Sequence, residues 1–514
     1  MAEFTKTAAA SPQPLPQFAW MLLLALVVFV YFFGLTIPLL GPDEPRYAQV
    51  AREMWQAGDW ITPTLGGFHW FEKPALLYWL QIASYSIFGT VEFAARFGSA
   101  LFGLGTIAAM WLLGRKSTSA CKSGPDVTYN RNSQFANYLA LITATSLGVI
   151  VFSHGASFDI IVTFPLTASL VSFFIFDPSS KTDTGPKYFP LVLFYFFIGV
   201  SLLAKGLIGI LFPYAIVAGY FILSRRLPTR ALVVSLVWGT LLACSIAAIW
   251  YLPMYQRHGW EFIDEFFIQH HFQRFSSNKY QHPQPFYFFL WVLPLMTFPW
   301  IPFFFAAIWK AAKTLAGIFQ PARRSEVSPL VAFAFSWLAV PLLFFSLSGS
   351  KLPGYILPAV PAAIILTALA VFELAERSSK WRTAIITAAA AMLVGVVGLF
   401  IFAVPRFAET DTVRSLIKTA DSRGFGESRV LMVYTISHNA EFYAPGRLFR
   451  DHAGKQKRFN TVDDLLAVLA SEKDCTALAL VPVEHLAVLT RDARIKTEVL
   501  GDNTELAIAA ISAK

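Results

Sequence analysis

The sequence predicts an α-helical polytopic membrane protein of about 11–13 spans, with interfacial helices in its first outer loop and a small C-terminal α/β domain. Composition is the first reason: of the 514 residues, 56% are hydrophobic and only 14% charged, against roughly 25% charged in soluble proteins. The second is a series of apolar runs that approach the roughly 20 residues needed to cross a bilayer. The third is a change near residue 405, after which charges of both signs become frequent. A soluble enzyme, a disordered chain and a single-anchor protein are excluded.

The first apolar run follows a polar N-terminal tail, residues 1–17, which we expect in the cytoplasm. This run is too long for the apolar part of a cleavable signal and lacks a convincing cleavage site, so we interpret it as the first span. Ten further spans follow it. The predicted spans are 18–40, 94–114, 137–153, 160–176, 188–204, 206–223, 231–252, 286–308, 328–347, 354–373 and 383–404.

The basic residues set the orientation, because cytoplasmic loops are enriched in Lys and Arg. Five loops are clearly basic, and they alternate correctly if the short apolar segment 75–89 does not cross the membrane. We therefore interpret 75–89 as an interfacial or re-entrant helix, with the N-terminus inside and the C-terminus outside. Thirteen spans result if one run hides a pair. The basic loop residues are Arg115, Lys116, Lys122, Arg131, Lys181, Lys187, Arg225, Arg226, Arg230, Lys310, Lys313, Arg323, Arg324, Arg377, Lys380 and Arg382.

Residues 405–514 are predicted to form a separate α/β domain on the outer face, beyond a membrane domain that covers 18–404. They hold 15 Lys and Arg against 15 Asp and Glu, so the net charge of +9 arises in residues 1–404. Because cytoplasmic loops explain that charge, a nucleic-acid partner loses its support. The three Cys are too few and too scattered for a disulfide framework or a Cys-rich metal site. The predicted strands are 430–434, 477–482 and 505–511, and the clearest predicted helix is 462–469.

Two short motifs in the first outer loop carry acidic and basic side chains at the membrane boundary. Asp43 and Glu44 follow the first span and open a helical pattern, where the helix dipole favours acids. Taken alone, the motif favours a structural role, with Asp43 as an N-cap and Glu44 as a first-turn acid, and both roles can hold together. The second motif, Phe-Glu-Lys-Pro at 71–74, lies at the entrance of segment 75–89. Lys73 is either a snorkelling interface anchor or a donor to phosphoryl oxygens.

Three more charged residues lie at outer turns. Asp159 is on a short turn between two spans, and a carboxylate at the edge of lipid is costly unless it faces protein or water. We interpret it as functional in preference to a plain turn residue. Lys351, at a turn into a span, and Lys205, between two adjacent spans, either snorkel or bind anions.

The second long outer loop contains an amphipathic helical pattern over 262–275. His270 and Arg274 are four residues apart and would share one helix face. A metal site with Glu265 is disfavoured, because these residues lack tight metal-ligand spacing. We prefer a basic pair for a lipid phosphate.

All these charges fall on one side of the membrane, although the orientation was set by other residues. The pattern predicts an outer-facing cavity where carboxylates and cations meet at the membrane boundary. Such a cavity suits a reaction between a phosphate-bearing lipid and a polar partner. The residues are Asp43, Glu44, Glu72, Lys73, Asp159, Lys205, Arg274 and Lys351.

The motifs in these loops resemble the lipid A aminoarabinose transferases, which are polyprenyl-phosphate-dependent glycosyltransferases of the C-type superfamily, related to protein O-mannosyltransferases. The likeness covers most of residues 18–404, and the C-terminal domain is similar in placement only. It is carried by Gly41-Pro42-Asp43-Glu44-Pro45-Arg46-Tyr47, Ala51-Arg52-Glu53-Met54, Phe71-Glu72-Lys73-Pro74, Leu77-Tyr78-Trp79-Leu80, Glu92-Phe93-Ala94-Ala95-Arg96, His270 to Arg274, Lys351-Leu352-Pro353 and Tyr355.

The resemblance implies a multi-pass protein of the bacterial inner membrane, with its active site and C-terminal domain facing the periplasm. It implies transfer of a sugar, 4-amino-4-deoxy-L-arabinose or a related one, from undecaprenyl phosphate. The acceptor would be lipid A or another envelope glycan or protein. Inversion at the anomeric carbon is implied, with no obligatory metal and no cofactor.

The resemblance also assigns residues by position. Asp43 matches the family's catalytic aspartate, and Asp159 is the second candidate catalytic residue. Lys73 and Arg274 match the cations that hold the carrier-lipid phosphate. The remaining candidate substrate-binding residues are Arg46, Tyr47, Glu72, Lys205, His270, Lys351 and Tyr355.

Three other functions stay open on the sequence. A protein O-glycosyltransferase would share the cavity but accept Ser or Thr. A transporter would need ionisable groups near the bilayer midplane and inverted repeats, and most span interiors lack charge. A non-catalytic lipid-binding scaffold would tolerate the loss of Asp43.

Overall fold

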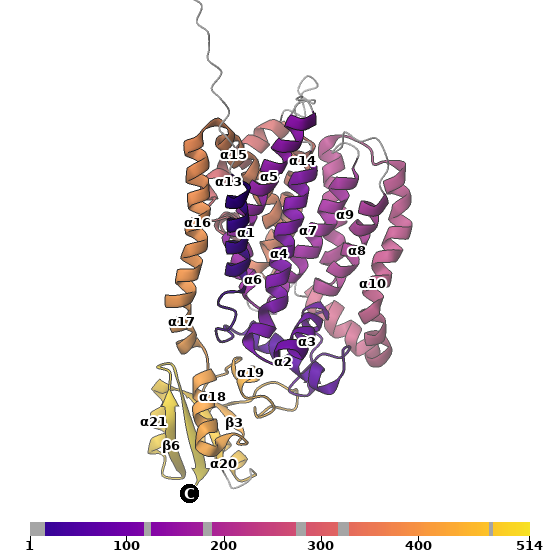
Figure 1. Cartoon of the computed structure of the whole chain (residues 1–514). Helices are drawn as coiled ribbons and strands as arrows, with labels where there is room; N and C mark the ends of the chain where they lie inside the picture. The colour runs from indigo at the N-terminus through magenta and orange to yellow at the C-terminus, as the bar shows by residue number, and fades with distance from the viewer. Residues whose placement is uncertain (1–15, 118–124, 178–187, 274–283, 317–327, 472–475) are drawn as a thin grey trace, which may run out of the picture. The chain divides into compact units, whose positions relative to one another are not determined.

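The chain forms two compact units (Figure 1). The computed structural model describes residues 16–117, 125–177, 188–273, 284–316, 328–471 and 476–514, without the side chains of 125–130, 271, 272 and 316. The helical unit comprises Met1–Phe32, Ser99–His154 and Phe158–Val396. The sheet unit comprises Phe33–Gly98, Gly155–Ser157 and Val397–Lys514.

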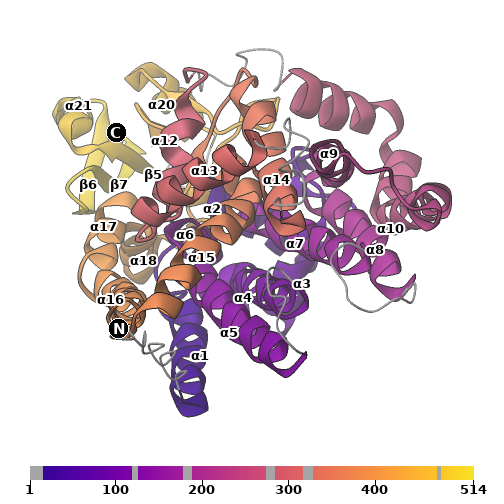
Figure 2. The same ribbon diagram turned by 90° about the horizontal axis from the view of Figure 1, so that it is seen from above.

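The helical unit is a set of apolar helices that run alongside one another (Figures 1 and 2). Helix α8 packs between α7 and α10, α9 packs on α14, and α15 contacts α13 and α5. The bounds are α1 Gln17–Phe32, α5 Pro125–Thr145, α6 Leu147–His154, α7 Phe158–Phe176, α8 Tyr188–Lys205, α9 Ile208–Ser224, α10 Arg230–Phe262, the π-helix η2 Ile263–Gln273, α12 Phe288–Met296, α13 Ile301–Ala316, α14 Pro329–Ser346, the 3₁₀ helix η5 Pro353–Ala359 and α15 Val360–Arg377. Helices α4, Glu92–Lys116, and α16, Ser379–Phe402, have residues in both units.

The predicted fold class is confirmed. The described residues contain seven helices long and apolar enough to cross a membrane, or up to nine if each of two bent pairs is one span. Helices α1 and α9 are shorter, and they account for the other two predicted spans. The segment predicted not to cross the membrane forms α3, Leu76–Phe88, which has only 13 residues.

The first predicted span is too long, because helix α1 ends at Phe32 rather than at residue 40. Gly34 adopts a left-handed conformation with φ of +82°, which stops the helix. The carbonyl groups of Leu35, Ile37 and Pro38 accept hydrogen bonds from Arg96, which replaces the missing helical partners. Residues 33–40 are therefore an ordered connection rather than part of the span.

Two predicted spans, 137–153 and 286–308, are broken rather than straight. Helices α5 and α6 meet at 56°, and α12 and α13 meet at 118°. The second break contains Pro299, which has no N–H to continue a helix. Polar groups at the two breaks form hydrogen bonds with each other. Leu147 N donates to Phe298 O at 2.9 Å, and Trp300 Nε1 donates to Thr145 Oγ1 at 3.1 Å. Irregular backbone is tolerated at membrane depth only with such internal partners.

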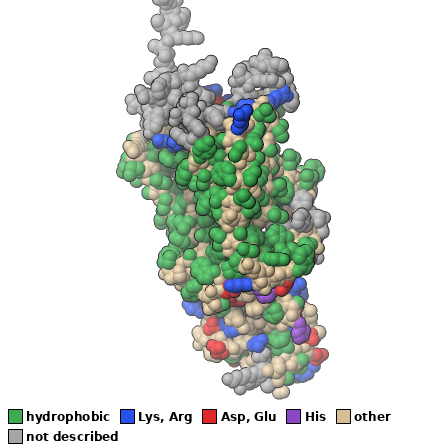
Figure 3. All heavy atoms as spheres, turned by 90° about the vertical axis from the view of Figure 1, so that its right-hand side faces the viewer, with side chains coloured by type: hydrophobic (Ala, Val, Ile, Leu, Met, Phe, Trp, Pro, Cys, Tyr) green, Lys and Arg blue, Asp and Glu red, His purple; other side chains and the backbone are tan. Residues whose placement is uncertain are grey.

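Helix α10 is longer than the predicted span 231–252. It continues to Phe262, with a non-helical Gly259 near its end, and η2 follows it. The start of the predicted outer loop is therefore helical. On the face drawn in Figure 3, hydrophobic side chains cover the helices, as a lipid-facing surface requires, whereas charges of both signs lie over the C-terminal residues.

The loop predicted to be the first outer one folds into two helices and a hairpin within the sheet unit. Helix α2, Asp43–Ala57, ends at Gly58, whose left-handed conformation caps it. Strands β1, Thr64–Leu65, and β2, Phe68–His69, form an antiparallel hairpin that the sequence did not predict. Helix α3 then packs on α2, so the two helices expected in this loop are present.

The C-terminal residues form a five-stranded sheet of order β4-β3-β5-β7-β6. Strand β3 is parallel to β4 and β5, and β7 is antiparallel to β5 and β6. The three predicted strands and helix α20 are present, whereas β4 and β6 were not predicted. The bounds are α17 Val404–Asp411, α18 Arg414–Ala420, β3 Val430–Val433, α19 Ala440–Tyr443, β4 Arg458–Phe459, α20 Val462–Leu469, β5 Thr476–Pro482, α21 Leu486–Arg491, β6 Ile495–Asp502 and β7 Leu506–Ala513, with short η6 Asp421–Phe425 and η8 Val483–His485.

Both faces of this sheet are buried under helices. Alternate residues of β3 point to opposite faces: Val430 and Met432 join the cluster under α18 and α19, and Leu431 and Val433 join the cluster with α20 and α21. The sheet therefore supplies a rigid core for the loops at its edges, including the loop between β3 and α19.

Candidate active site

Helix α2 brings the first candidate residues together. Asp43 is the first residue of the helix, after Pro42, and Pro42 makes no side-chain cap. The structural alternative of Asp43 as an N-cap is therefore wrong, because the residue lies inside the first turn. Its carboxylate still gains from the helix dipole, since the first-turn N–H groups carry partial positive charge.

A cluster of acidic and basic side chains lies around this helix start. Asp43 Oδ1 pairs with Arg46 Nη2 at 2.5 Å, one helical turn along. Glu72 Oε1 pairs with Lys73 Nζ at 2.8 Å. The charges of both carboxylates act on Arg46, which places the two pairs in one group. We call these residues, with Tyr47, the Asp43 cluster.

Exposure separates the two carboxylates of the Asp43 cluster. The Asp43 side chain is 50% exposed, whereas those of Glu72 and Lys73 are 13% and 15% exposed. Burial disfavours the charged guanidinium, but the charges of Asp43 and Glu72 outweigh it and raise the pKa of Arg46 above its ordinary value. Arg46 is thus a permanent cation between two acids, and Asp43 is the acid open to an incoming molecule.

Aromatic side chains enclose the cluster. The Arg46 guanidinium lies over the Trp70 ring, 5.6 Å from its centroid, and the rings of Tyr47 and Tyr78 meet edge to face at 6.5 Å. Burial and then the charges of Asp43 and Glu72 raise the pKa of Tyr47 well above its ordinary value. Its phenol therefore stays protonated and keeps its donor hydrogen.

Glu44 has a structural role instead. It pairs with Arg96 at 2.6 Å and also accepts hydrogen bonds from Leu40 N and Ala156 N. The Arg96 and Glu44 side chains are 4% and 14% exposed. This buried pair fixes the connection before α2, so Asp43 keeps its position and Glu44 is not available to a substrate.

The hairpin is fastened to α2 by Glu53. Its carboxylate accepts hydrogen bonds from Thr64 Oγ1 at 3.0 Å, Gly66 N at 2.7 Å and Gly67 N at 3.1 Å. A backbone clamp of this kind holds the segment that leads to Glu72 and Lys73. The Asp43 cluster is therefore built on rigid supports.

A second group lies in the helical unit, and we call it the Asp159 cluster. Asp159, in the first turn of α7, is paired with Lys205, the last residue of α8. The Lys205 ammonium lies 5.0 Å from the centroid of the Tyr355 ring. A Cβ atom on Gly354 would lie 1.9 Å from Asp159 Oδ2, so only glycine allows η5 to approach this closely. Asp159, Lys205 and Tyr355, predicted separately, thus meet in one place.

The other predicted basic residues, Lys351, His270 and Arg274, lie outside these two clusters or outside the described residues. Lys351 is only 6% exposed, and its ammonium donates to the carbonyl groups of Ser348 at 2.6 Å and Gln284 at 3.1 Å. It therefore fixes the turn between α14 and η5. His270 is partly buried in η2, and Arg274 lies outside the described residues.

The sequence found the charged residues of both clusters but missed one residue. This residue is His438, in the loop between β3 and α19, and the charges of Arg46 and Asp43 act on the pKa of its imidazole. No local motif marks it, because it reaches α2 only through the tertiary fold. The two clusters belong to different units.

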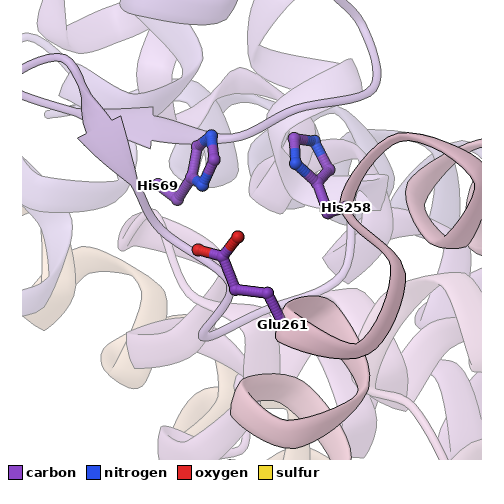
Figure 4. Close-up of side chains that lie close together, drawn as sticks. All are labelled: His69, His258 and Glu261. Atoms are coloured by element: carbon purple, nitrogen blue, oxygen red, sulfur yellow. The ribbon is translucent and has the colours of Figure 1, made fainter.

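Figure 4 draws three other side chains of metal-binding types, His69 at the end of β2 and His258 and Glu261 near the end of α10. His69 belongs to the sheet unit, where its ring stacks on Phe71 at 4.9 Å, and the other two belong to the helical unit. We assign no metal centre to them.

Comparisons with known proteins agree with these motifs. A family model described as dolichyl-phosphate-mannose-protein mannosyltransferase matches residues 18–263. The undecaprenyl phosphate-α-4-amino-4-deoxy-L-arabinose arabinosyl transferase of Aeromonas hydrophila is 32% identical over 392 residues, which cover 75% of this chain and 66% of that protein. The protein of the same name from Serratia proteamaculans is 32% identical over 70% of this chain and 61% of its own length.

Solved structures show the same fold. The crystal structure of ArnT from Cupriavidus metallidurans bound to undecaprenyl phosphate superposes with a TM-score of 0.72 at 22% identity, covering 96% of this chain and 98% of that one. Its apo form gives a TM-score of 0.75. The chain spans slightly less than two thirds of the arabinosyl transferases that it matches in sequence. The fold, the motifs and these relatives agree, and the chain is similar to the lipid A aminoarabinose transferases and, over residues 18–263, to the protein mannosyltransferases.

Proposed function

We propose that the chain transfers a sugar from undecaprenyl phosphate to an envelope acceptor at the periplasmic face of the bacterial inner membrane. The sugar would be 4-amino-4-deoxy-L-arabinose or a related one, and the acceptor lipid A. The observation that carries the proposal is the Asp43 cluster, in which a half-exposed carboxylate lies beside fixed cations. The names of the relatives support the donor and the sugar.

The proposed reaction is a single displacement at the anomeric carbon. An acceptor oxygen forms a bond to that carbon as the bond to the carrier phosphate oxygen breaks, and undecaprenyl phosphate leaves with the electron pair. If the acceptor is a hydroxyl, its proton passes to the Asp43 carboxylate, a contribution of roughly 10²–10⁴-fold for a well-placed base. If the acceptor is a phosphate, Asp43 positions it and stabilises the oxocarbenium-like centre.

Fixed cations would stabilise the charge on the leaving phosphate, because they act strongly in a site with little water. In the sheet unit this role goes to Lys73, held by Glu72 and close to Arg46. We also assign phosphate binding to Arg274 and lipid-phosphate or sugar contacts to His270 on the family resemblance alone. This assignment needs no metal ion or cofactor.

The helical unit would contribute the Asp159 cluster. We propose Asp159 as a second catalytic carboxylate, with Lys205 and Tyr355 as substrate-binding partners that hold its charge and orientation. Tyr47 would donate to a substrate oxygen, because its phenol stays protonated. Lys351 would act through the turn that it fixes rather than by direct contact.

A second candidate function is supported by the match of residues 18–263 to the mannosyltransferase family. In that case the donor lipid and the cavity would be shared, and the acceptor would be a Ser or Thr hydroxyl of a protein. The chemistry at Asp43 would then be that of a general base.

One experiment separates the two. The purified protein in lipid nanodiscs is incubated with undecaprenyl phosphate-aminoarabinose and with lipid A or a Ser/Thr-rich peptide, and the acceptors are weighed by mass spectrometry. The proposal expects the sugar mass on lipid A and free undecaprenyl phosphate in equal amount. Sugar on the peptide alone would favour the second function, and no transfer with either acceptor would contradict both.

A further inference from the structure

The loop between β3 and α19 is tied to the start of helix α2 through one residue, Asp411. The Asp411 carboxylate accepts a hydrogen bond from Gly41 N at 2.9 Å, just before the helix that begins with Asp43. The Asp411 carbonyl accepts a hydrogen bond from the Asn439 amide at 3.0 Å. The residue after His438 and the turn before Asp43 therefore share one anchor.

The next segment, α19, continues this attachment along α2 (Figure 1). Arg52 donates to Phe442 O at 2.8 Å, and its guanidinium lies 3.9 Å from the centroid of the Phe442 ring. The Tyr443 hydroxyl accepts from Leu39 N at 2.8 Å and donates to Glu92 at 3.1 Å. Contacts made by the residues that follow His438 thus hold this segment against α2.

The imidazole of His438 is half-buried, and among the described residues neither ring nitrogen has a hydrogen-bond partner. Burial and then the charge of Arg46 lower the pKa of His438 to about 4, while the charge of Asp43 acts in the opposite direction. The ring is therefore neutral at pH 7. A neutral imidazole offers one N–H donor and one nitrogen acceptor.

Neither ring nitrogen is fully enclosed by the described residues, so an incoming molecule can reach both. Arg46 is already paired with Asp43, and Lys73 with Glu72. His438 is therefore a polar side chain near Asp43 whose hydrogen-bonding capacity is open to a ligand.

We propose that His438 binds the sugar acceptor beside Asp43, donating its ring N–H to an acceptor oxygen, so that the C-terminal domain forms part of the acceptor site. This inference rests on the proposed function and deepens it. The oxygen belongs either to a phosphate or to a hydroxyl of the acceptor, and both accept the same hydrogen bond.

The kinetic test compares His438→Ala, His438→Gln and, as a control in the same domain, the exposed His452→Ala. Loss of one hydrogen bond predicts an acceptor KM about tenfold higher in His438→Ala, with the donor KM unchanged. Gln retains a donor and should recover most of the difference, and His452→Ala should match the wild type. Lipid A and its dephosphorylated form are used in parallel, and an effect confined to the phosphorylated form identifies a phosphate oxygen.

A protection experiment on the wild-type protein tests the same inference if His438→Ala does not fold. Diethyl pyrocarbonate modifies neutral imidazoles, and peptide mass spectrometry reports each site. Acceptor should protect His438 and not His452, and donor alone should protect neither. Equal modification of His438 with and without acceptor, or a wild-type acceptor KM in His438→Ala, overturns this inference alone. A wild-type protein that transfers no sugar to any acceptor overturns the proposed function and this inference with it.

Discussion

Asp43 and Glu44 are adjacent at the start of α2 but differ in burial and in their partners, and helix geometry explains the difference. Successive side chains point about 100° apart around a helix axis, so Asp43 and Glu44 cannot face the same neighbours. Glu44 turns to Arg96 and is nearly buried, whereas Asp43 stays half-exposed beside Arg46. The same short motif thus combines a buried anchor with a half-exposed carboxylate.

The anchor predicts a large effect on stability. Arg96→Ala removes the partner of a nearly buried carboxylate and frees three backbone carbonyl groups, so it should destabilise the protein by about 3–5 kcal/mol. The measurement is thermal unfolding of the detergent-solubilised protein. Lys310→Ala, which breaks an exposed pair with Glu373, is the control and should change stability by about 1 kcal/mol or less. Equal unfolding temperatures for the two variants would contradict the anchoring role.

Sequence motifs predicted these residues well, because charged side chains at a membrane boundary stand out against apolar surroundings. Asp43 and Lys73 were predicted from their motifs and do lie in one cluster. His438 could not be predicted, because the contacts that bring it to α2 join residues almost 400 positions apart. The separation of Asp43 from Glu44 also needed the structure, since both acids precede the same helical pattern.

Among the elements, the short 3₁₀ helix η5 sets the geometry of the Asp159 cluster. Gly354 lies so close to Asp159 that no Cβ atom fits while the carboxylate stays paired with Lys205. The long apolar helices were predicted from hydropathy, but this contact and the breaks after Thr145 and Met296 were not. Hydropathy averages over a window and does not register a single bend or close approach.

Gly354→Ala is therefore expected to displace the Asp159 carboxylate while leaving the fold intact. Misplacement of a reactive group by about 1 Å can cost 10²-fold in rate, so sugar transfer should fall by a factor of that order. Gly395→Ala is the matched control, because a Cβ atom there meets nothing within 4 Å. Transfer rates and gel-filtration profiles of both variants are compared. Full activity in Gly354→Ala would remove Asp159 from the proposed mechanism.

For the whole molecule, composition and loop charge predicted a multi-pass helical membrane protein. The breaks in its helices and the edge strands of its sheet depend on tertiary contacts and were not predicted. Eleven spans were predicted and each has a helical counterpart, although α1 is shorter and two spans are broken. In the C-terminal residues the buried central strands β3, β5 and β7 were predicted, because they are apolar runs. The edge strands β4 and β6 were missed, since their exposed residues dilute the apolar pattern.

The orientation of the chain is a prediction of its loop charges and is testable directly. In a variant with Cys121, Cys244 and Cys475 replaced by Ser, a single Cys is placed at exposed Gln56 or at exposed Ser379. A membrane-impermeant maleimide should label Gln56→Cys in cells with a permeabilised outer membrane, and Ser379→Cys only after lysis. The reverse labelling would place α2 in the cytoplasm and contradict a periplasmic active site.

We propose that the Asp43 carboxylate takes part in the sugar transfer itself, and the variant Asp43→Asn is the sharpest test of that role. The measurement pairs the transfer rate from undecaprenyl phosphate-sugar to lipid A with the affinity of the same purified protein for undecaprenyl phosphate. We expect a transfer rate lower by roughly 10²–10⁴-fold with carrier affinity unchanged, because the cations proposed to hold the phosphate remain. A wild-type rate in Asp43→Asn would contradict it.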